Sequence, residues 1–367
     1  MPYTRIFKVP DYYASFKCKC GACKNTCCHG WAITLSMPEY FRLCGIECSP
    51  KLRRALDAAL LVLDKPTPER YATFNTDWRG GCRLHREPDG LCALQLECGE
   101  EVLPAICRMY PRAAHTRYAD ECCCSAGCVA VAEELMERKS RLCFTELELT
   151  VPLEPEQKQK DSVSMLYIPV RERCIEILQI EGYTLEQKLA AVAELAEEAE
   201  NALASQAQEF DPKPAELYIE KAGRPMEFDV AAAKFLASWF AERSYSLLPY
   251  AEEAAEYYGA GCDASLSLPS PELALERLKD AEARRGNFEL ALENLLVNEV
   301  FLSGFPFNSD SPTDATLALQ ALYLILRYIA AATDGSAYAV FRVVDNTSFY
   351  ESAPKLMKLL VPTRAHK

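Results

Sequence analysis

The chain is rich in cysteine, and its cysteines are unevenly distributed. Of 18 cysteines in 367 residues, 16 lie at or before Cys143, and only Cys174 and Cys262 follow. The opening Met-Pro-Tyr-Thr-Arg lacks the apolar stretch of a secretory signal, so we expect a cytoplasmic protein. Because dense cysteines in a reducing compartment bind metal more often than they form disulfides, the sequence predicts a metal-binding N-terminal domain, with a disulfide scaffold as the alternative.

Charge divides the chain at nearly the same place. Residues 1–150 carry 20 Lys and Arg against 19 Asp and Glu, whereas residues 151–367 carry 20 against 34. An acidic domain without a basic stripe repels phosphate backbones, so we expect no nucleic-acid partner. A cationic partner fits this acidity better, although a solvated acidic helical surface would have the same composition.

Hydropathy gives no indication of a membrane partner. The sequence has no uninterrupted run of about 18 apolar residues, which is the length that a spanning helix needs. The longest apolar stretch, Ala321 to Ala332, is interrupted by Arg327. We therefore expect it to form a buried helix of a folded protein.

The two halves also differ in their expected secondary structure. Short elements separated by Cys, Gly and Pro are typical of residues 1–145, whereas later segments place apolar residues three or four apart, as in helices. Thr184 followed by Gln187 resembles a capping box, and the polar segment 154–164 is the expected linker or exposed loop. Helices are predicted at residues 38–43, 51–63, 128–138, 170–180, 184–207, 229–245, 271–284, 287–303 and 314–332.

These patterns predict a mainly α fold with two domains. A cysteine-rich, loop-heavy metal-cluster domain is expected over residues 1–150. An all-α helical domain that covers the site and binds substrate is expected over residues 165–367. No Gly-x-Gly-x-x-Gly motif follows a predicted strand, so the nucleotide-binding sheet of many methyltransferases and dehydrogenases is not indicated.

The first cysteines form a compact group of potential metal ligands. Cys18, Cys20 and Cys23 precede the vicinal pair Cys27-Cys28, with small or polar residues between them. Four thiolates complete either a tetrahedral zinc site or an iron–sulfur cluster. Adjacent thiols such as Cys27 and Cys28 more easily serve different atoms of a cluster, or different sites, than one zinc ion. Spacing alone leaves the metal open.

Further cysteines are scattered downstream, as in a site that the fold assembles. They include Cys82, Cys92, Cys107, Cys124 and Cys128. The remaining thiols are interpreted as small buried hydrophobic residues, namely Cys44, Cys48, Cys98, Cys122, Cys123, Cys143, Cys174 and Cys262. The histidines carry no clear functional signal. His29 could complete a metal shell but is more typical of a surface turn, and the same holds for His85 and His115.

Several motifs together resemble a known family. They are Cys18-x4-Cys23-x3-Cys27-Cys28-x2-Trp31, Gly90-Leu91-Cys92, Cys107-Arg108-x-Tyr110-Pro111-Arg112, Cys128 at a helix start, Glu293 to Glu299, and Phe305-Pro306-Phe307. This set is similar to that of the FliB-type flagellin lysine-N-methylases, which sit within a wider group of Cys-Cys-pair proteins that bind iron–sulfur clusters or zinc.

The resemblance implies a cytoplasmic enzyme that methylates surface lysines of flagellin, with S-adenosylmethionine as the methyl donor and a [4Fe-4S] cluster in the cysteine-rich domain. The implied metal ligands come from Cys18, Cys23, Cys27, Cys28, Cys82, Cys92, Cys107 and Cys128. Cys20 and the triplet Cys122-Cys123-Cys124 depart from the family pattern and could compete as ligands. The Cys-x3-Cys-x2-Cys triad of radical S-adenosylmethionine enzymes is missing, which puts a radical mechanism in doubt.

Arginine and amide side chains are candidates for binding the donor. Arg108 and Arg112 flank Tyr110, the candidate catalytic residue, and their forked donors could pair with the methionine carboxylate. Structural ion pairing or solvent exposure is the alternative for both arginines. Asn294 and Asn298 share a helical face and could bind adenine or ribose, with Glu293 on the ribose hydroxyls. Buried amides that tie neighbouring helices together would show the same pattern.

Polar methyl transfer also constrains the site that receives the lysine. An amine with a pKa near 10.4 is less than about 0.1% neutral at pH 7, and only the neutral form attacks the sulfonium methyl. An apolar environment favours the neutral amine, whereas carboxylates favour the ammonium. We therefore expect a groove that is aromatic and largely uncharged at its floor. The competing interpretations are a noncatalytic binding protein stapled by iron–sulfur or zinc and an electron carrier.

Overall fold

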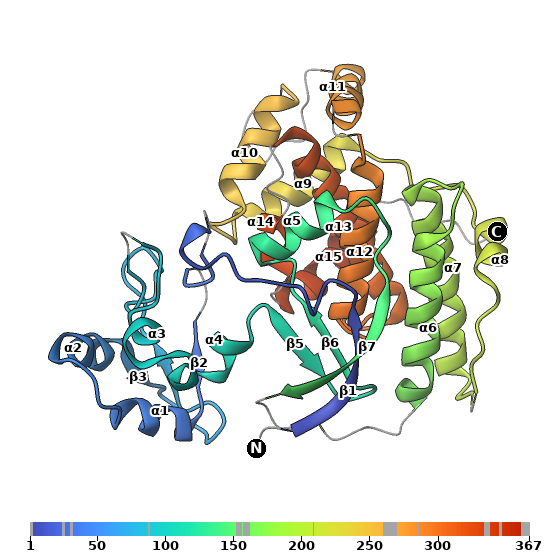
Figure 1. Ribbon diagram of the computed structural model, residues 1–367. Helices are drawn as coiled ribbons and strands as arrows, with labels where there is room; N and C mark the ends of the chain where they lie inside the picture. The colour runs from blue at the N-terminus through green and yellow to red at the C-terminus, as the bar shows by residue number, and fades with distance from the viewer. Residues whose placement is uncertain are drawn as a thin grey trace. The chain divides into compact units, whose positions relative to one another are not determined.

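The computed structural model divides the chain into two compact units (Figure 1), which are Phe16–Arg112 together with Met1, and Pro2–Ser15 together with Ala113–Lys367. The structure describes residues 3–23, 26–29, 32–86, 89–151, 156, 162–207, 209–259, 270–284, 286–333, 338–344 and 347–360. Trp31, Cys262, His366 and most of the expected linker 154–164 lie outside these residues.

The smaller unit is built from short elements around a compact core. Its helices are α1 (Met37–Cys44), α2 (Pro50–Ala59), α3 (Ala93–Cys98) and α4 (Ala105–Met109), with the 3₁₀ turns η1 (Cys20–Ala22) and η2 (Glu100–Val102). Strands β2 (Thr34–Leu35), β4 (Ala72–Phe74) and β3 (Leu60–Val62) form an antiparallel sheet in that order. Leu35, Leu43, Leu56, Phe74 and Leu94 belong to one buried cluster that joins sheet and helices.

Local sequence signals explain where these helices begin and end. Ser36 and Glu39 form a capping box at the start of α1, in which the Ser36 N–H donates to Glu39 Oε2 at 2.8 Å. The Ser49 hydroxyl caps α2 by accepting from the Leu52 N–H. The prediction of one helix over residues 51–63 is wrong at its end. The chain leaves the helix after Ala59, and Leu60–Val62 pair with β4 as strand β3 instead.

The larger unit contains a four-stranded sheet that the sequence analysis did not predict. The strands are β1 (Tyr3–Pro10), β5 (Arg112–His115), β6 (Glu121–Cys124) and β7 (Phe144–Val151), in the order β5-β6-β1-β7. β1 pairs antiparallel with β7 over eight residues and parallel with β6. Since β1 and β7 flank the smaller unit in sequence and pair within the larger one, the division falls near residue 112 and differs from the predicted 1–150 and 165–367.

Helices make up the rest of the larger unit. They are α5 (Val129–Glu137), α6 (Ser162–Gln179), α7 (Leu185–Ala204), α8 (Ala215–Lys221), α9 (Val230–Ala241), α10 (Leu248–Tyr257), α11 (Pro271–Arg284), α12 (Phe288–Leu302), α13 (Pro312–Ala332), α14 (Tyr338–Val344) and α15 (Thr347–Leu360). The mainly α prediction is confirmed. The helical unit is not all-α, because strands from outside residues 165–367 join it.

Most helix predictions in this half are confirmed within a few residues. Thr184 caps α7 and forms the expected capping box, with the Thr184 N–H donating to Gln187 Oε1 at 2.9 Å. Asp229 caps α9 by accepting from the Ala231 and Ala232 N–H groups. α6 begins at Ser162, inside the expected linker, so that segment is not a loop throughout. The helices α8, α10, α14 and α15 had no counterpart in the predictions.

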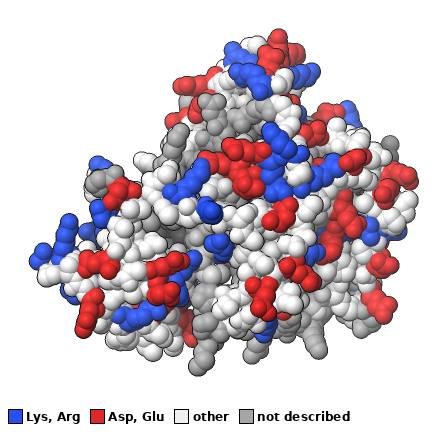
Figure 2. Space-filling view, viewed as in Figure 1, with Lys and Arg blue, Asp and Glu red and all other residues white. Residues whose placement is uncertain are grey.

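Helix α13 forms the centre of the helical unit. It contacts α7, α9 and α15 most extensively, and Figure 1 shows these helices around it. Its length and mean hydropathy would suit a membrane span, but 83% of its most apolar window is buried inside the protein, as in the core helix of a folded domain. Arg327, which interrupts the apolar run, pairs with Glu186 and Glu282. On the face shown in Figure 2, acidic and basic side chains are interspersed.

Candidate functional site

Four of the eight candidate ligand cysteines lie near one another in the smaller unit. Cys28, Cys82, Cys92 and Cys107 are within electrostatic range of each other, and we refer to them as the thiol tetrad. The Cys82 N–H donates to the Cys28 carbonyl at 2.8 Å, and Cys92 caps the start of α3. Cys107 lies on α4, so three separate loops and one helix supply the tetrad. The fold therefore gathers thiols that are up to 79 positions apart in sequence.

Burial and mutual repulsion both disfavour negative charge on three of these thiols. Burial raises the pKa of Cys82 to about 11, and the charges on Cys28 and Cys92 add to the effect. Burial also raises the pKa of Cys107 far above its ordinary value, followed by the charges on Cys82, Cys28 and Cys92. A cation held between these sulfurs would offset both effects, because metal-bound cysteines are thiolates. The tetrad therefore has the chemistry of a metal or cluster site.

Cys28 differs from its three neighbours. A hydrogen bond from the Cys27 thiol lowers the pKa of Cys28 to about 6, although burial opposes this shift, and Thr26 contributes a second hydrogen bond. Cys28 is half-buried, whereas Cys27 is exposed. The vicinal cysteines divide their roles in this geometry: one lies in the tetrad and the other donates to it.

The type and number of donors in the tetrad bear on which metal centre it could hold. Within the described ranges, no three His, Cys, Asp or Glu side chains are arranged to hold a metal ion. One zinc ion needs four sulfurs at about 2.3 Å, hence about 3.8 Å from each other. In a four-iron cluster each thiolate binds a different iron, so the sulfurs lie farther apart. The donor type and number in the tetrad fit such a cluster.

The other candidate cysteines occupy different places. Cys18 is exposed and accepts the Cys20 N–H at 3.3 Å, and the charge on Cys18 is the main cause that raises the pKa of Cys20. Cys23 follows η1 and is half-buried. Cys128 belongs to the larger unit, where it precedes α5. In the tetrad, by contrast, the four thiols interact electrostatically with one another.

The cysteines assigned to buried packing meet that prediction in part. Cys122, Cys123 and Cys174 are fully buried. Cys44 and Cys143 are exposed, so the prediction is wrong for them: Cys44 is the last residue of α1, and Cys143 precedes β7. Cys122-Cys123-Cys124 form strand β6 with all three side chains inside the larger unit.

Arg108, Tyr110 and Arg112 follow Cys107 along the chain but differ in their contacts. Arg108 Nη1 lies 3.8 Å from Glu101 Oε2, and the buried Arg108 Nε has no hydrogen-bond partner among the residues described. Arg112 donates to the Phe16 carbonyl at 3.4 Å and stacks on the Phe16 ring. Tyr110 ends α4. Of the two arginines, Arg108 has the donor capacity to bind an anionic group.

The candidate donor-binding residues of α12 are buried and already engaged. Asn294 Oδ1 accepts the Leu142 N–H at 2.9 Å, and its amide nitrogen donates to the Ser140 carbonyl at 3.1 Å. Glu293 accepts from Lys188 and Arg141, both at 2.8 Å. These contacts are those of the alternative interpretation, in which polar side chains tie neighbouring elements together. A cofactor at this place would have to replace them.

Asn298 belongs to a buried polar network that the sequence analysis did not foresee. Its Oδ1 accepts the Tyr12 hydroxyl at 2.6 Å and the Cys123 thiol at 3.4 Å, and its amide nitrogen donates to the Cys124 carbonyl at 3.0 Å. Burial is the main cause that raises the pKa of Tyr12 and of Cys123 well above their ordinary values. The network joins β6, α12 and the turn after β1, and its groups are neutral hydrogen-bonding groups at pH 7.

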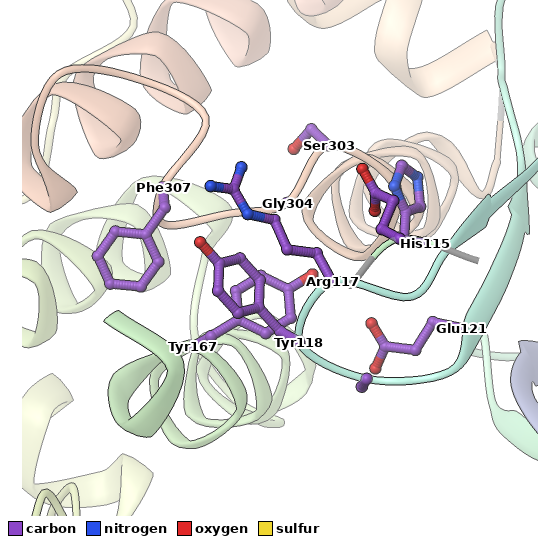
Figure 3. Close-up of a pocket in the computed structure, with 10 residues that line it drawn as sticks. His115, Arg117, Tyr118, Glu121, Tyr167, Ser303, Gly304 and Phe307 are labelled. Carbon is purple, nitrogen blue, oxygen red and sulfur yellow. The ribbon is translucent and has the colours of Figure 1, made fainter. Parts of the chain in front are cut away.

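A cavity of about 200 Å³ lies in the larger unit, at the ends of β5 and α12 (Figure 3). Its lining includes aromatic side chains, a histidine and both signs of charge. The residues are His115, Arg117, Tyr118, Ala119, Glu121, Glu156, Tyr167, Ser303, Gly304 and Phe307. Sequence analysis assigned no role to His115. The family motif Phe305-Pro306-Phe307 is the one sequence motif that contains a residue of this lining, Phe307.

Comparison with known proteins concerns mainly the helical half. Residues 171–341 match the FliB lysine N-methylase C-terminal domain. This region of the chain is thus similar to the C-terminal domain of the FliB family. The resemblance inferred from the motifs is thereby confirmed. The matched region includes Glu293, Asn298 and Phe307 but none of the eight candidate ligand cysteines.

Curated relatives agree with this assignment at low identity. The chain is 25% identical over 158 residues to the lysine-N-methylases of Salmonella typhimurium (strain LT2) and of Salmonella choleraesuis (strain SC-B67), a match that covers 41% of this chain and 39% of each relative. It is 27% identical over 107 residues to the flagellar biosynthetic protein FliU of Salmonella muenchen, covering 29% of this chain and 62% of that protein. The chain thus spans about two fifths of the length of the FliB-type methylases. No solved structure matches the chain.

Proposed function

We propose that the chain is a cytoplasmic lysine N-methyltransferase that uses S-adenosylmethionine to methylate surface lysines of flagellin. The observation that carries this proposal is the FliB-type domain at residues 171–341. Two relatives named lysine-N-methylase and one named a flagellar biosynthetic protein support the reaction class and a flagellar substrate.

The thiol tetrad is the proposed site of a [4Fe-4S] cluster. Cys28, Cys82, Cys92 and Cys107 supply the required number and type of ligands, and burial of uncompensated thiolates there would be unfavourable. With only three of these four thiolates bound, such a cluster would have one open iron, which could ligate the donor's amino and carboxylate groups. Arg108, whose buried Nε has no partner among the described residues, is placed next to Cys107 in sequence to bind the same carboxylate.

A second candidate function is a noncatalytic protein in which a metal centre staples the smaller unit. Cys82, Cys92 and Cys107 pack against the hydrophobic core of this unit, between its short helices and sheet. A metal bound there would link loops that bury little apolar surface of their own, as in small metal-dependent domains. This alternative predicts metal-dependent stability without methyl transfer.

The decisive experiment is mass spectrometry of flagellin after incubation with anaerobically reconstituted protein and S-adenosylmethionine. Methylation adds about 14 Da per methyl group to lysine-containing peptides. The Cys107→Ser variant should lose both the brown colour of the cluster and the activity. Cys44→Ser, which changes an exposed thiol in the same unit, should keep both. Unmodified flagellin with fully loaded wild-type protein would contradict the proposed reaction and favour the metal-stapled alternative.

A further inference from the structure

The cavity in the larger unit has an aromatic wall. Tyr118 and Tyr167 lie with their ring centroids 4.6 Å apart, and Figure 3 shows them together, with Phe307 on one side and His115 on the other. Alkyl chains gain free energy when they leave water for such a surface. The wall therefore favours a ligand with an aliphatic stem.

The charged groups around the cavity balance each other. Glu121 forms a bidentate ion pair with Arg171, which is fully buried. Glu156 and Arg117 contribute one charge of each sign to the lining. The Arg117 guanidinium lies over the Tyr118 ring, 5.5 Å from its centroid. A ligand with a full net charge would gain little here, whereas a neutral polar head group would find donors and acceptors.

His115 offers an acceptor in the lining of this cavity. Its Nε2 is buried and has no hydrogen-bond partner within the described part of the chain. Burial lowers the pKa of His115, an effect that Arg171 supports and that Glu156 and Glu121 oppose. The ring is therefore neutral at pH 7, and a neutral imidazole with its proton on Nδ1 accepts a hydrogen bond at Nε2.

The other groups that reach the cavity also suit an N–H donor. Ser303 caps the carboxyl end of α12, and Gly304 follows it. The last carbonyl groups of a helix point beyond its end and carry partial negative charge. An amine in the cavity could thus donate to Nε2 on one side while it faces the carbonyl end of α12 on the other.

The size of the cavity selects a single side chain. The cavity has a volume of about 200 Å³. Pockets for whole small molecules measure about 300–1,000 Å³, so this cavity is too small for a complete nucleoside-containing donor. Four methylenes and an amine, the side chain of lysine, fit within it.

We propose that this cavity binds the acceptor lysine side chain, with its alkyl stem on Tyr118, Tyr167 and Phe307 and its amine donating to His115 Nε2. The inference rests on the proposed lysine methylation and adds to it the place where the substrate side chain enters. It also matches the requirement for an aromatic, weakly charged floor, because the paired charges leave the amine in its neutral form.

The methyl transfer in this cavity balances in atoms and charge. The lysine first loses one proton to water as it enters, and its nitrogen then forms a bond to the methyl carbon while the methyl–sulfur bond breaks. The sulfonium donor leaves as a neutral thioether, and the positive charge moves to the methylated amine. The extra proton on this ammonium passes to His115 Nε2 and from there to water, which restores the neutral imidazole.

The first test uses n-butylamine, which reproduces the lysine side chain, and follows the imidazole signals of the full-length protein by NMR. The chain has only four histidines, and the signal missing from the His115→Gln spectrum identifies His115. Butylamine should shift this signal in the wild type and in Cys44→Ser, which changes an exposed thiol of the smaller unit. It should not shift it in Ala119→Leu, where the larger side chain fills the cavity. A His115 signal that does not respond in the wild type, or that responds equally in Ala119→Leu, overturns the proposal, as does stronger binding of butanoate than of butylamine.

The second test measures methylation of a lysine peptide. His115→Gln keeps an acceptor oxygen but cannot carry a proton, so kcat should fall by about 100-fold or more with little change in KM. Ala119→Leu should instead raise KM. Wild-type kinetics in both variants overturn the site even if the chain methylates flagellin. Butylamine binding at His115 by a wild type that never methylates would leave the site standing and refute the proposed function.

Discussion

Replacing Arg171 with methionine should destabilise the larger unit strongly. The Arg171 side chain is 0% exposed, and Glu121, its partner on β6, is 3% exposed. Two guanidinium nitrogens donate to the two carboxylate oxygens, and Nη1 also donates to the Tyr167 hydroxyl at 3.1 Å. The variant therefore leaves a carboxylate buried without its countercharge.

The magnitude follows from the burial of both groups. Removing one partner of a buried ion pair costs about 3–5 kcal/mol, because the remaining charge keeps its desolvation penalty and loses its compensation. The guanidinium also packs over the Tyr167 and Phe301 rings, at 4.9 and 4.8 Å from their centroids, and methionine retains part of that contact. At about 2–4 °C per kcal/mol for a domain of this size, Tm should fall by roughly 6–20 °C.

Thermal unfolding monitored by circular dichroism measures this shift, and a double-mutant cycle identifies its cause. Arg171→Met combined with Glu121→Leu removes both charges, so the double variant should be more stable than Arg171→Met alone. Arg173→Met, which changes a neighbouring helix position whose side chain is 22% exposed, is the control and should lower Tm much less. A drop below about 3 °C for Arg171→Met, or losses that simply add in the double variant, would refute the reasoning.

Three further outcomes are expected from the same structure. Asn298→Leu removes the 2.6 Å acceptor of the Tyr12 hydroxyl and a donor to the Cys124 carbonyl, so these two groups keep only their 3.4 Å contact with each other. The variant should lower the free energy of unfolding in urea denaturation by about 1–3 kcal/mol; unchanged stability would show that water replaces the amide. Thr184→Ala removes the capping box of α7 and should cost about 0.5–2 kcal/mol, whereas Thr184→Ser should cost little. His115 has a lowered pKa in the folded state, so it binds a proton more readily when unfolded. Its contribution favours the folded state above the ordinary pKa of about 6.5 and is lost as pH falls from there through the folded-state pKa. His115→Gln should therefore flatten the dependence of the free energy of unfolding on pH in that range. An unchanged pH dependence would argue against the shifted pKa.

The helices of the larger unit could be predicted because their signals are local. Thr184, Asp229 and Ser311 each cap a helix by accepting from backbone N–H groups two or three residues ahead, which depends only on neighbours in sequence. The apolar period of α12 and α13 follows from the turn of the helix itself. Likewise, the concentration of cysteines in the first part of the chain identified the unit that gathers the thiol tetrad.

Tertiary structure decided what depends on partners far apart in the chain. β1 and β7 carry alternating residues, but only their pairing across more than 130 positions placed the N-terminal strand in the helical unit and moved the division to residue 112. The selection of Cys28, Cys82, Cys92 and Cys107 from eight candidates depends on how three loops and a helix meet. The cavity beside His115 is lined by residues nearly 200 positions apart, and no local sequence pattern indicates which distant side chains the fold brings together. Sequence thus determined elements whose energetics are local, and the fold determined the sites, because burial and electrostatic proximity are properties of the folded chain.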